Sequence, residues 1–223
     1  MKPVLGLALI LLCFDAPAAA KKVAVPPTGA PIAESRRYFT DDPDAPIHAP
    51  KSHDITIVEY LDYQCPYCRT SAAALKELVK RDKKIRVVFR DWPIFGAESE
   101  RAARVAIAAK YQGKYVAVND ALMNAPRPLT EAKIEAAARK AGVNWPRLEA
   151  DLQAHLTDID DLLERNQEQA LLLGFKGTPG FIIGNFLSSG GITYAGLQQT
   201  VREARGKAKG LPSTIRKSRL KNK

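Results

Sequence analysis

The sequence contains few cysteines and, beyond its N-terminus, no long run of apolar residues. Three of its 223 residues are cysteines, and two of them, Cys65 and Cys68, belong to one C-x-x-C motif. No later segment is long and apolar enough to predict a transmembrane helix. Heptads and internal repeats are also missing, so the sequence predicts neither an oligomerisation stalk nor a repeat architecture. The length suffices for one domain with a full core.

Histidine is scarce as well. The three histidines, His48, His53 and His155, are not at the spacing of zinc ligands. A metal-binding module that uses Cys65 and Cys68 with a histidine is therefore a disfavoured alternative. We expect no metal and no cofactor.

The first twenty residues are typical of a secretory signal peptide. Lys2 is a short basic region, residues 4–14 are an apolar core, and residues 18–20 form an A-x-A cleavage site. Cleavage after Ala20 would remove Cys13 and leave the C-x-x-C pair as the only cysteines. That usage fits an oxidising compartment, so we expect a periplasmic or otherwise exported protein.

The regions next to both termini are unlike the rest of the chain. Residues 21–50 hold six prolines and predict a linker or irregular arm. The formal net charge is +10, and residues 207–223 carry many lysines and arginines but no acid. We interpret them as a solvated, disordered tail, with contact to an anionic membrane surface as the alternative. Nucleic-acid binding is disfavoured, because export removes that partner and the tail lacks aromatic residues.

The motif Cys65-Pro66-Tyr67-Cys68 follows an apolar run at 55–61 that predicts a strand. A helix over 66–81 would begin at Pro66, whose fixed φ suits the first helical position. Its unpaired N–H groups and positive dipole end would lie beside Cys65 and favour an exposed thiolate there. Cys68, one turn on, would point inward and act as the resolving thiol. This placement predicts a redox couple rather than a structural staple.

The rest of the pattern predicts further strands and helices. They are a strand at 85–89, helices at 98–112, 114–124, 130–141 and 146–173, a hairpin of 181–183 with 191–194, and a final helix at 194–205. The order is β-α-β, a helical block, then β-β-α.

Glu59 stands six residues before Cys65, in a strand whose neighbours are apolar. Strand alternation places Ile57, Glu59 and Leu61 on one face, which would bury a carboxyl group beneath the cysteines. Burial without a cation raises a carboxyl pKa, so Glu59 could exchange a proton with Cys68. The alternative is a glutamate at the edge of the sheet that reaches water.

Gly177-Thr178-Pro179-Gly180 precedes the third predicted strand. A proline in a glycine-framed turn before a strand is a candidate for a cis peptide, although most such bonds are trans. A cis bond would turn the Thr178 backbone toward the cysteines, where it could pair with an extended substrate.

Several segments together resemble the DsbA-like branch of the thioredoxin superfamily. They are VEYLDYQCPYC at 58–68, DWPIFG at 91–96, SERAA at 99–103, the helical block, and GTPGFIIG at 177–184. The resemblance covers about residues 38–205.

That resemblance implies an α/β fold, a thioredoxin fold with an inserted helical domain. Residues 51–97 and 175–206 would form the thioredoxin-like domain, and residues 98–174 the insertion. It also implies thiol-disulfide oxidoreductase activity on unfolded or reduced exported proteins, with a membrane redox partner that recycles the disulfide. Cys65 would be the attacking cysteine, Cys68 its buried partner, Pro179 the cis-proline and Glu59 the buried acid.

Two positions depart from the strongest oxidase of the branch. The dipeptide is Pro66-Tyr67 rather than Pro-His, so no imidazolium stabilises the thiolate. Thr178 stands where that oxidase has valine, and threonine there is also found in isomerase and reductase relatives. These departures leave the direction of exchange open.

Our leading hypothesis is a monomeric dithiol oxidase. A disulfide isomerase or reductase is the alternative, although no dimerisation module is evident. A glutaredoxin gains support from Pro66-Tyr67 and Gly190-Gly191, yet export and the long insertion oppose it. A holdase chaperone with a vestigial site is a further possibility.

Overall fold

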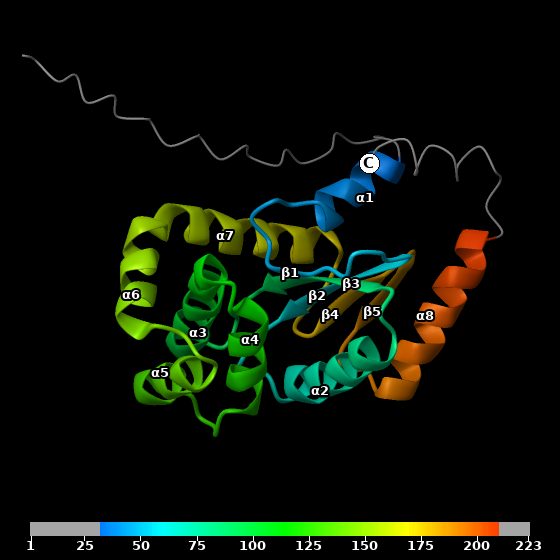
Figure 1. Ribbon diagram of the computed structural model, residues 1–223. Coiled ribbons are helices and arrows are strands. Elements are labelled where there is room, and N and C mark those ends of the chain that lie inside the picture. The colour runs from blue at the N-terminus through cyan, green and yellow to red at the C-terminus, as the bar shows by residue number, and fades with distance from the viewer. Residues whose placement is uncertain (1–31, 210–223) are drawn as a thin grey trace, which may run out of the picture.

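The computed structural model describes residues 32–209, which form a five-stranded sheet with helices on both faces (Figure 1). The strand order is β1-β3-β2-β4-β5. The strands are β1 (Ile47–His48), β2 (Ile55–Leu61), β3 (Ile85–Asp91), β4 (Gly180–Ile183) and β5 (Phe186–Ser189). β2 and β3 are parallel, and the other pairings are antiparallel.

Two helices pack on one face of the sheet and one long helix crosses the other (Figure 1). The pair is α2 (Pro66–Arg81) and α8 (Tyr194–Lys209), and the long helix is α7 (Leu156–Leu172). Between β3 and β4 the chain also forms α3 (Ala97–Ala108), η1 (Ala109–Gln112), α4 (Tyr115–Asn124), α5 (Glu131–Lys140) and α6 (Trp145–Ala154). These elements form the predicted helical block, which lies beside the sheet.

The strand and helix on either side of the cysteine motif have the predicted bounds, 55–61 and 66–81. β2 lies in the middle of the sheet, between β3 and β4. The edge-of-sheet interpretation of Glu59 is therefore wrong: its residue is only 1% exposed. β3 runs two residues beyond the predicted 85–89, because charged Arg90 and Asp91 continue the pairing with β2.

The predicted helix at 146–173 is two helices, α6 and α7, which meet at His155. His155 leaves the helical conformation, with φ −119° and ψ 20°. Its imidazole stacks on Tyr111, with ring centroids 3.8 Å apart. No proline or glycine lies at this break to predict it from the sequence. The break coincides instead with the contact between His155 and Tyr111, which belong to distant segments.

The hairpin after the Thr178 loop also differs from the prediction. Its second strand is β5 at 186–189, not 191–194. Gly184 and Asn185 form the two-residue connection, and Gly184 has a φ of +58° that favours glycine. Residues 190–193 instead join β5 to α8, and the Ile192 N–H donates to the Ser71 hydroxyl at 3.0 Å.

The arm expected to be irregular contains α1 (Ile32–Thr40) and β1, so that expectation is wrong for residues 32–40 and 47–48. A fully buried ion pair joins this arm to the sheet: Arg90 donates to Asp42 at 2.8 Å. Arg90 also donates to the Phe39 carbonyl at 2.9 Å and to Asn166 of α7 at 3.2 Å. Arg165 reaches Asp42 from α7 at 3.3 Å. The arm is therefore part of the folded structure.

The expected tail begins too early, since α8 continues to Lys209. The predicted signal peptide at 1–20 and the tail beyond residue 209 lie outside the described residues. Within residues 32–209, no helix combines the length and apolarity that crossing a membrane requires.

Candidate active site

Cys65 is the N-cap residue of α2, with Pro66 in the first turn. Its conformation is extended, with φ −70° and ψ 122°, so its side chain lies at the start of the helix. Both Cys65 and Cys68 are free thiols in the structure. Cys65 is only 1% exposed, which corrects the expected exposed thiolate. The Thr178 loop covers it: the Cys65 thiol donates to the Thr178 carbonyl at 3.2 Å.

The two thiols have opposite acidities. A hydrogen bond from the Cys68 thiol, then the nearby Thr178 side chain and the N–H groups of Cys68 and Tyr67, lower the pKa of Cys65 to about 6 despite its burial. Burial raises the pKa of Cys68 far above that of a free thiol. Cys68 Sγ accepts a long 3.5 Å hydrogen bond from the Asp62 N–H. The pair thus combines an acidic sulfur with one that holds its proton.

The Thr178–Pro179 peptide bond is cis. Thr178 is 9% exposed, and its hydroxyl has no hydrogen-bond partner among the described residues. The Pro179 carbonyl accepts a hydrogen bond from Gly190 at 2.8 Å, which ties the loop to the segment after β5. The structure therefore brings the Thr178 loop and Cys65 together, as the resemblance implies.

Asp62 organises the loop between β2 and Cys65. Its buried carboxylate accepts from Gln64 N–H at 2.7 Å and Ser99 Oγ at 2.8 Å through one oxygen. The other oxygen accepts from the N–H groups of Ile94 at 2.6 Å and Phe95 at 3.1 Å. Sequence reasoning assigned no role to Asp62, although its place directly after a buried strand was a usable signal.

A second connection reaches the same loop from the segment between α4 and α5. The Arg127 guanidinium donates to the Tyr63 carbonyl, and the Leu129 N–H donates to the Gln64 side chain at 3.0 Å. Arg127 Nε is buried without a partner among the described residues. No local sequence pattern identifies Arg127 and Leu129 as site residues, because only folding brings them next to the loop before Cys65.

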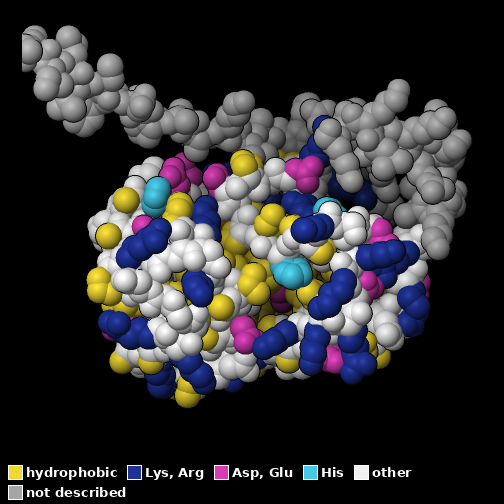
Figure 2. Space-filling model, in the orientation of Figure 1, with side chains coloured by type: hydrophobic (Ala, Val, Ile, Leu, Met, Phe, Trp, Pro, Cys, Tyr) yellow, Lys and Arg dark blue, Asp and Glu magenta, His cyan; other side chains and the backbone are white. Residues whose placement is uncertain are grey.

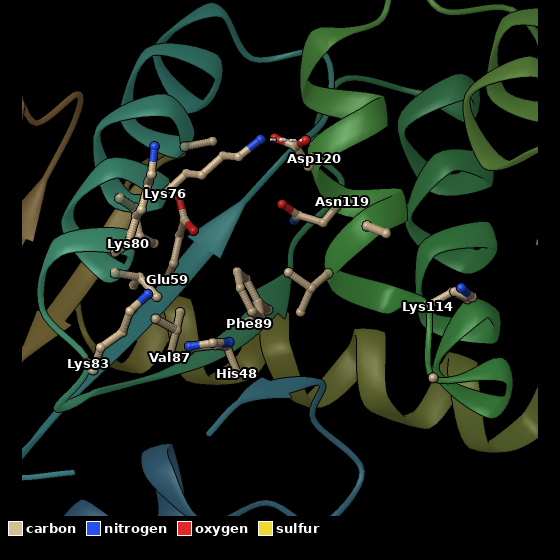
Figure 3. Close-up of a pocket in the computed structure, with 16 residues that line it drawn as sticks. His48, Glu59, Lys76, Lys80, Lys83, Val87, Phe89, Lys114, Asn119 and Asp120 are labelled. Atoms are coloured by element: carbon tan, nitrogen blue, oxygen red, sulfur yellow. Dashed lines mark hydrogen bonds and ion pairs between the residues drawn. The ribbon is translucent and has the colours of Figure 1, made fainter. Parts of the chain in front are cut away.

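Glu59 lies on β2 and lines a cavity between α2 and α4 (Figure 3). Burial and then the nearby Asp91 raise the pKa of Glu59 to about 8. One of its oxygens is buried with no partner among the described residues. No hydrogen bond between Glu59 and Cys68 is found within this part of the chain.

Asp91 is a second buried acid, which the sequence reasoning missed. Burial raises its pKa to about 7, and Tyr115 donates to it at 2.8 Å. The Tyr115 hydroxyl also lies 3.5 Å from that of Tyr63, which in turn accepts from Asn119 at 3.3 Å. Asn119 lines the same cavity as Glu59, so a buried polar network extends from the cavity toward the loop before Cys65.

Apolar side chains are exposed on the segments that meet at the cysteines. Tyr67 is 65% exposed and lies against Gly191, while Phe95 is 49% exposed. The described residues contain no group of three or more histidines, cysteines and acids that could hold a metal ion.

Comparison with known families decides the classification. The model of the DSBA-like thioredoxin domain matches residues 56–202. The chain belongs to this family. Its fold is thus the thioredoxin fold with a helical insertion, as predicted, and the chain is a DsbA-like member of the thioredoxin superfamily.

Three solved structures illustrate the relationship. A thioredoxin-like oxidoreductase from Silicibacter pomeroyi is 37% identical, with a TM-score of 0.72, over 77% of this chain and 98% of that one. A periplasmic thioredoxin-like protein from Salmonella enterica serovar Typhimurium is 27% identical, with a TM-score of 0.65, over 76% and 94%. The thiol-disulfide exchange protein alpha-DsbA2 from Wolbachia pipientis is 25% identical, with a TM-score of 0.72, over 77% and 92%.

Curated relatives include proteins named as Na(+)/H(+) antiporters. One from Salinispora tropica is 29% identical over 64% of this chain, but the match covers only 22% of that protein. The chain spans about a quarter of the length of such relatives, so their names describe those proteins alone.

We predict that Cys65 titrates with a midpoint near pH 6, because donors to its sulfur favour the thiolate. Thiolate absorbance at 240 nm and the rate of iodoacetamide alkylation measure this midpoint. In Cys68→Ser a hydroxyl can still donate, so the midpoint should stay lower than in Cys68→Ala. A wild-type midpoint near the free-thiol value of about 8.5 would contradict this assignment.

The raised pKa of Glu59 predicts a pH-dependent stability. Between its usual pKa and about 8, the unfolded chain ionises Glu59 while the folded chain keeps the proton, so stability falls as pH rises. Glu59→Gln should therefore gain stability relative to wild type from pH 5 to pH 8, by at most about 1.4 kcal/mol per pH unit. Urea unfolding measures the difference.

Glu59→Leu is the matched control for packing. It should show the same change in pH dependence as Glu59→Gln, although its absolute stability differs. If the stability of the wild type changed with pH in parallel with that of both variants, Glu59 would be ionised in the folded protein.

Proposed function

We propose that the chain introduces disulfides into exported proteins through a Cys65–Cys68 couple. The observation that carries this proposal is the asymmetric pair: an acidic Cys65 at the start of α2 beside a buried Cys68 that retains its proton. Only the reduced form carries the Cys65 thiolate, so donors at the helix N-terminus stabilise reduced enzyme relative to disulfide. A couple stabilised in this way is an oxidant.

The chemistry follows from this asymmetry. A substrate thiolate attacks Cys65 Sγ of the disulfide form, the Cys65–Cys68 bond breaks, and Cys68 leaves with the electron pair and takes up a proton. A second substrate thiolate then attacks the substrate sulfur of the mixed disulfide. The products are a substrate disulfide, the Cys65 thiolate and the Cys68 thiol, so two electrons pass from substrate to enzyme.

Glu59 is the proposed proton source for Cys68. With a pKa of about 8, Glu59 holds its proton at neutral pH and can release it to a departing sulfur. Because no hydrogen bond joins the two groups among the described residues, transfer would use water in the cavity that Glu59 lines. In the reverse direction, the Glu59 carboxylate would accept the Cys68 proton before that thiol attacks.

Substrate would bind over the Thr178 loop. The Thr178 carbonyl already accepts the Cys65 thiol proton at 3.2 Å, so a chain extended along this loop would lie against the reactive sulfur. Exposed Tyr67 and Phe95 offer apolar contacts to an unfolded protein. Pro66 and Pro179, the chain neighbours of Cys65 and Thr178, have no N–H to donate to the sulfur.

We also propose a periplasmic or otherwise exported location, a monomeric state, and reoxidation by a membrane redox partner. A structural relative described as periplasmic supports the location. A second candidate function is that of an isomerase or reductase. Tyr67 and Thr178 favour it, because they stand where the strongest oxidase of the branch has histidine and valine.

The reduction potential separates these candidates. We predict a value above roughly −200 mV, because the Cys65 thiolate is stabilised in the reduced form. Equilibration with glutathione, followed by alkylation and mass analysis, measures it. Tyr67→His should raise the potential by adding an imidazolium beside the thiolate, and Tyr67→Phe is the control that should not. A wild-type value near about −270 mV would favour the reductase or isomerase.

The proton-transfer role of Glu59 predicts a defect confined to Cys68. Glu59→Gln should slow attack of Cys68 on a mixed disulfide at Cys65 by about tenfold or more, since no carboxylate removes the proton. Rapid quenching of a Cys65 mixed disulfide measures this step. Alkylation of Cys65 in the same variant is the control and should change little. An unaltered exchange rate across neutral pH would remove Glu59 from the mechanism.

A further inference from the structure

A cavity of about 560 Å³ lies between α2, α4 and the sheet (Figure 3). This volume is within the range of small-molecule sites. Apolar side chains of the helices and of β3 line it, among them Leu75, Val79, Val87 and Phe89. In Figure 2 a hollow with hydrophobic side chains in it opens near the middle of the face, with lysines and arginines around it.

The rim of the cavity is cationic on the α2 side. Lys76 and Lys80 lie one turn apart on α2, and Lys83 follows the end of the helix; all three line the cavity (Figure 3). Lys76 pairs with Asp120 across the mouth at 2.8 Å. Lys80 and Lys83 form no ion pair among the described residues. Lys114 also borders the cavity, but its amine lies toward Gly142.

The floor of the cavity holds one polar group that lacks a partner. Glu59 is 1% exposed, yet one of its oxygens has no hydrogen bond within residues 32–209. A pKa of about 8 leaves this group mostly uncharged at neutral pH, so it does not repel an anion. His48 and the paired Asp120 are the other titratable groups besides the lysines. The lining is thus apolar, with positive charge at its mouth.

We propose that this cavity binds a small amphiphilic monoanion, its acid group on Lys80 and Lys83 and its apolar body against Val87 and Phe89. Charge complementarity selects an anion, because no unpaired acid lies on the rim. The apolar lining selects a ligand with a hydrocarbon body over a free inorganic anion. The occupant is neither substrate nor product of thiol exchange, although it would lie in the cavity through which Glu59 is proposed to exchange its proton.

Isothermal titration of the full chain with decanoate, below its micellar concentration, tests the proposal. Three comparison ligands each change one property of decanoate. Decanol has no charge, decyltrimethylammonium has a positive charge, and acetate has no long apolar body. Decanoate should bind at least about tenfold more tightly than decanol, as expected for about 1.4 kcal/mol of charge interaction. Acetate and the cation should bind more weakly still. Equal affinities for decanoate and decanol would overturn the proposal.

Two variants locate the binding. Lys80→Gln with Lys83→Gln should weaken decanoate binding about tenfold and leave decanol unchanged, whereas the exposed pair Lys140→Gln with Lys176→Gln should change neither more than twofold. Ala117→Phe, on the exposed side of α4, should weaken both ligands by filling the mouth. Decanoate binding that survives Ala117→Phe, or that falls equally in both lysine pairs, would place the ligand elsewhere.

Thiol exchange measured on the same preparations keeps the two proposals apart. A chain that exchanges disulfides but binds no decanoate would overturn the amphiphile site alone. A chain that binds decanoate in the predicted order, with a potential near that of thioredoxin, would leave the site standing and overturn the oxidase proposal.

Discussion

The placement of the cysteines depends on one buried carboxylate, that of Asp62. It accepts four hydrogen bonds, two from the loop and helix around it and two from the Ile94 and Phe95 backbone. A buried ion is tolerated only when its hydrogen-bonding capacity is filled, and here each donor comes from a segment that must be correctly placed. The end of β2, the turn after β3 and the start of α3 are thereby fixed together. Cys65 follows three residues later on a loop that has little freedom left.

The two thiols are chemically identical, and their pKa values differ because their surroundings differ. Cys65 receives donors at a helix N-terminus, which lower its pKa, while Cys68 is one turn inside the protein, where burial raises its pKa. Glu59, also buried, keeps its proton near neutral pH, whereas buried Asp91, with a pKa of about 7, is only partly protonated there. The site therefore separates a place where negative charge is stabilised from a place where protons are stored. Disulfide exchange needs both, because one sulfur must carry charge and the other must gain and lose a proton.

The sequence predicted those parts of the structure that depend on short-range patterns. Strand β2 and helix α2 have the predicted bounds because an apolar run and Pro66 specify them locally. The break at His155 could not be predicted, because it coincides with stacking on Tyr111, more than forty residues away. The prolines of the arm concealed α1 and β1, which are held by contacts with β3 and α7. Within the site, the cysteine pair was visible in the sequence, whereas Asp62, Asp91 and Arg127 act only through segments that folding brings together.

The buried pair of Arg90 and Asp42 has a practical consequence for the N-terminal boundary of the folded unit. Arg90 lies on β3, while its carboxylate partner and the Phe39 carbonyl come from the proline-rich region ahead of the sheet. A chain trimmed at residue 50, where sequence patterns first suggest regular structure, would leave a guanidinium enclosed without its counter-charge. Tags, fusion partners and protease sites are therefore best kept out of the segment that holds Phe39 and Asp42. The segment around Phe39 and Asp42 thus belongs to the folded unit, which proline content alone does not reveal.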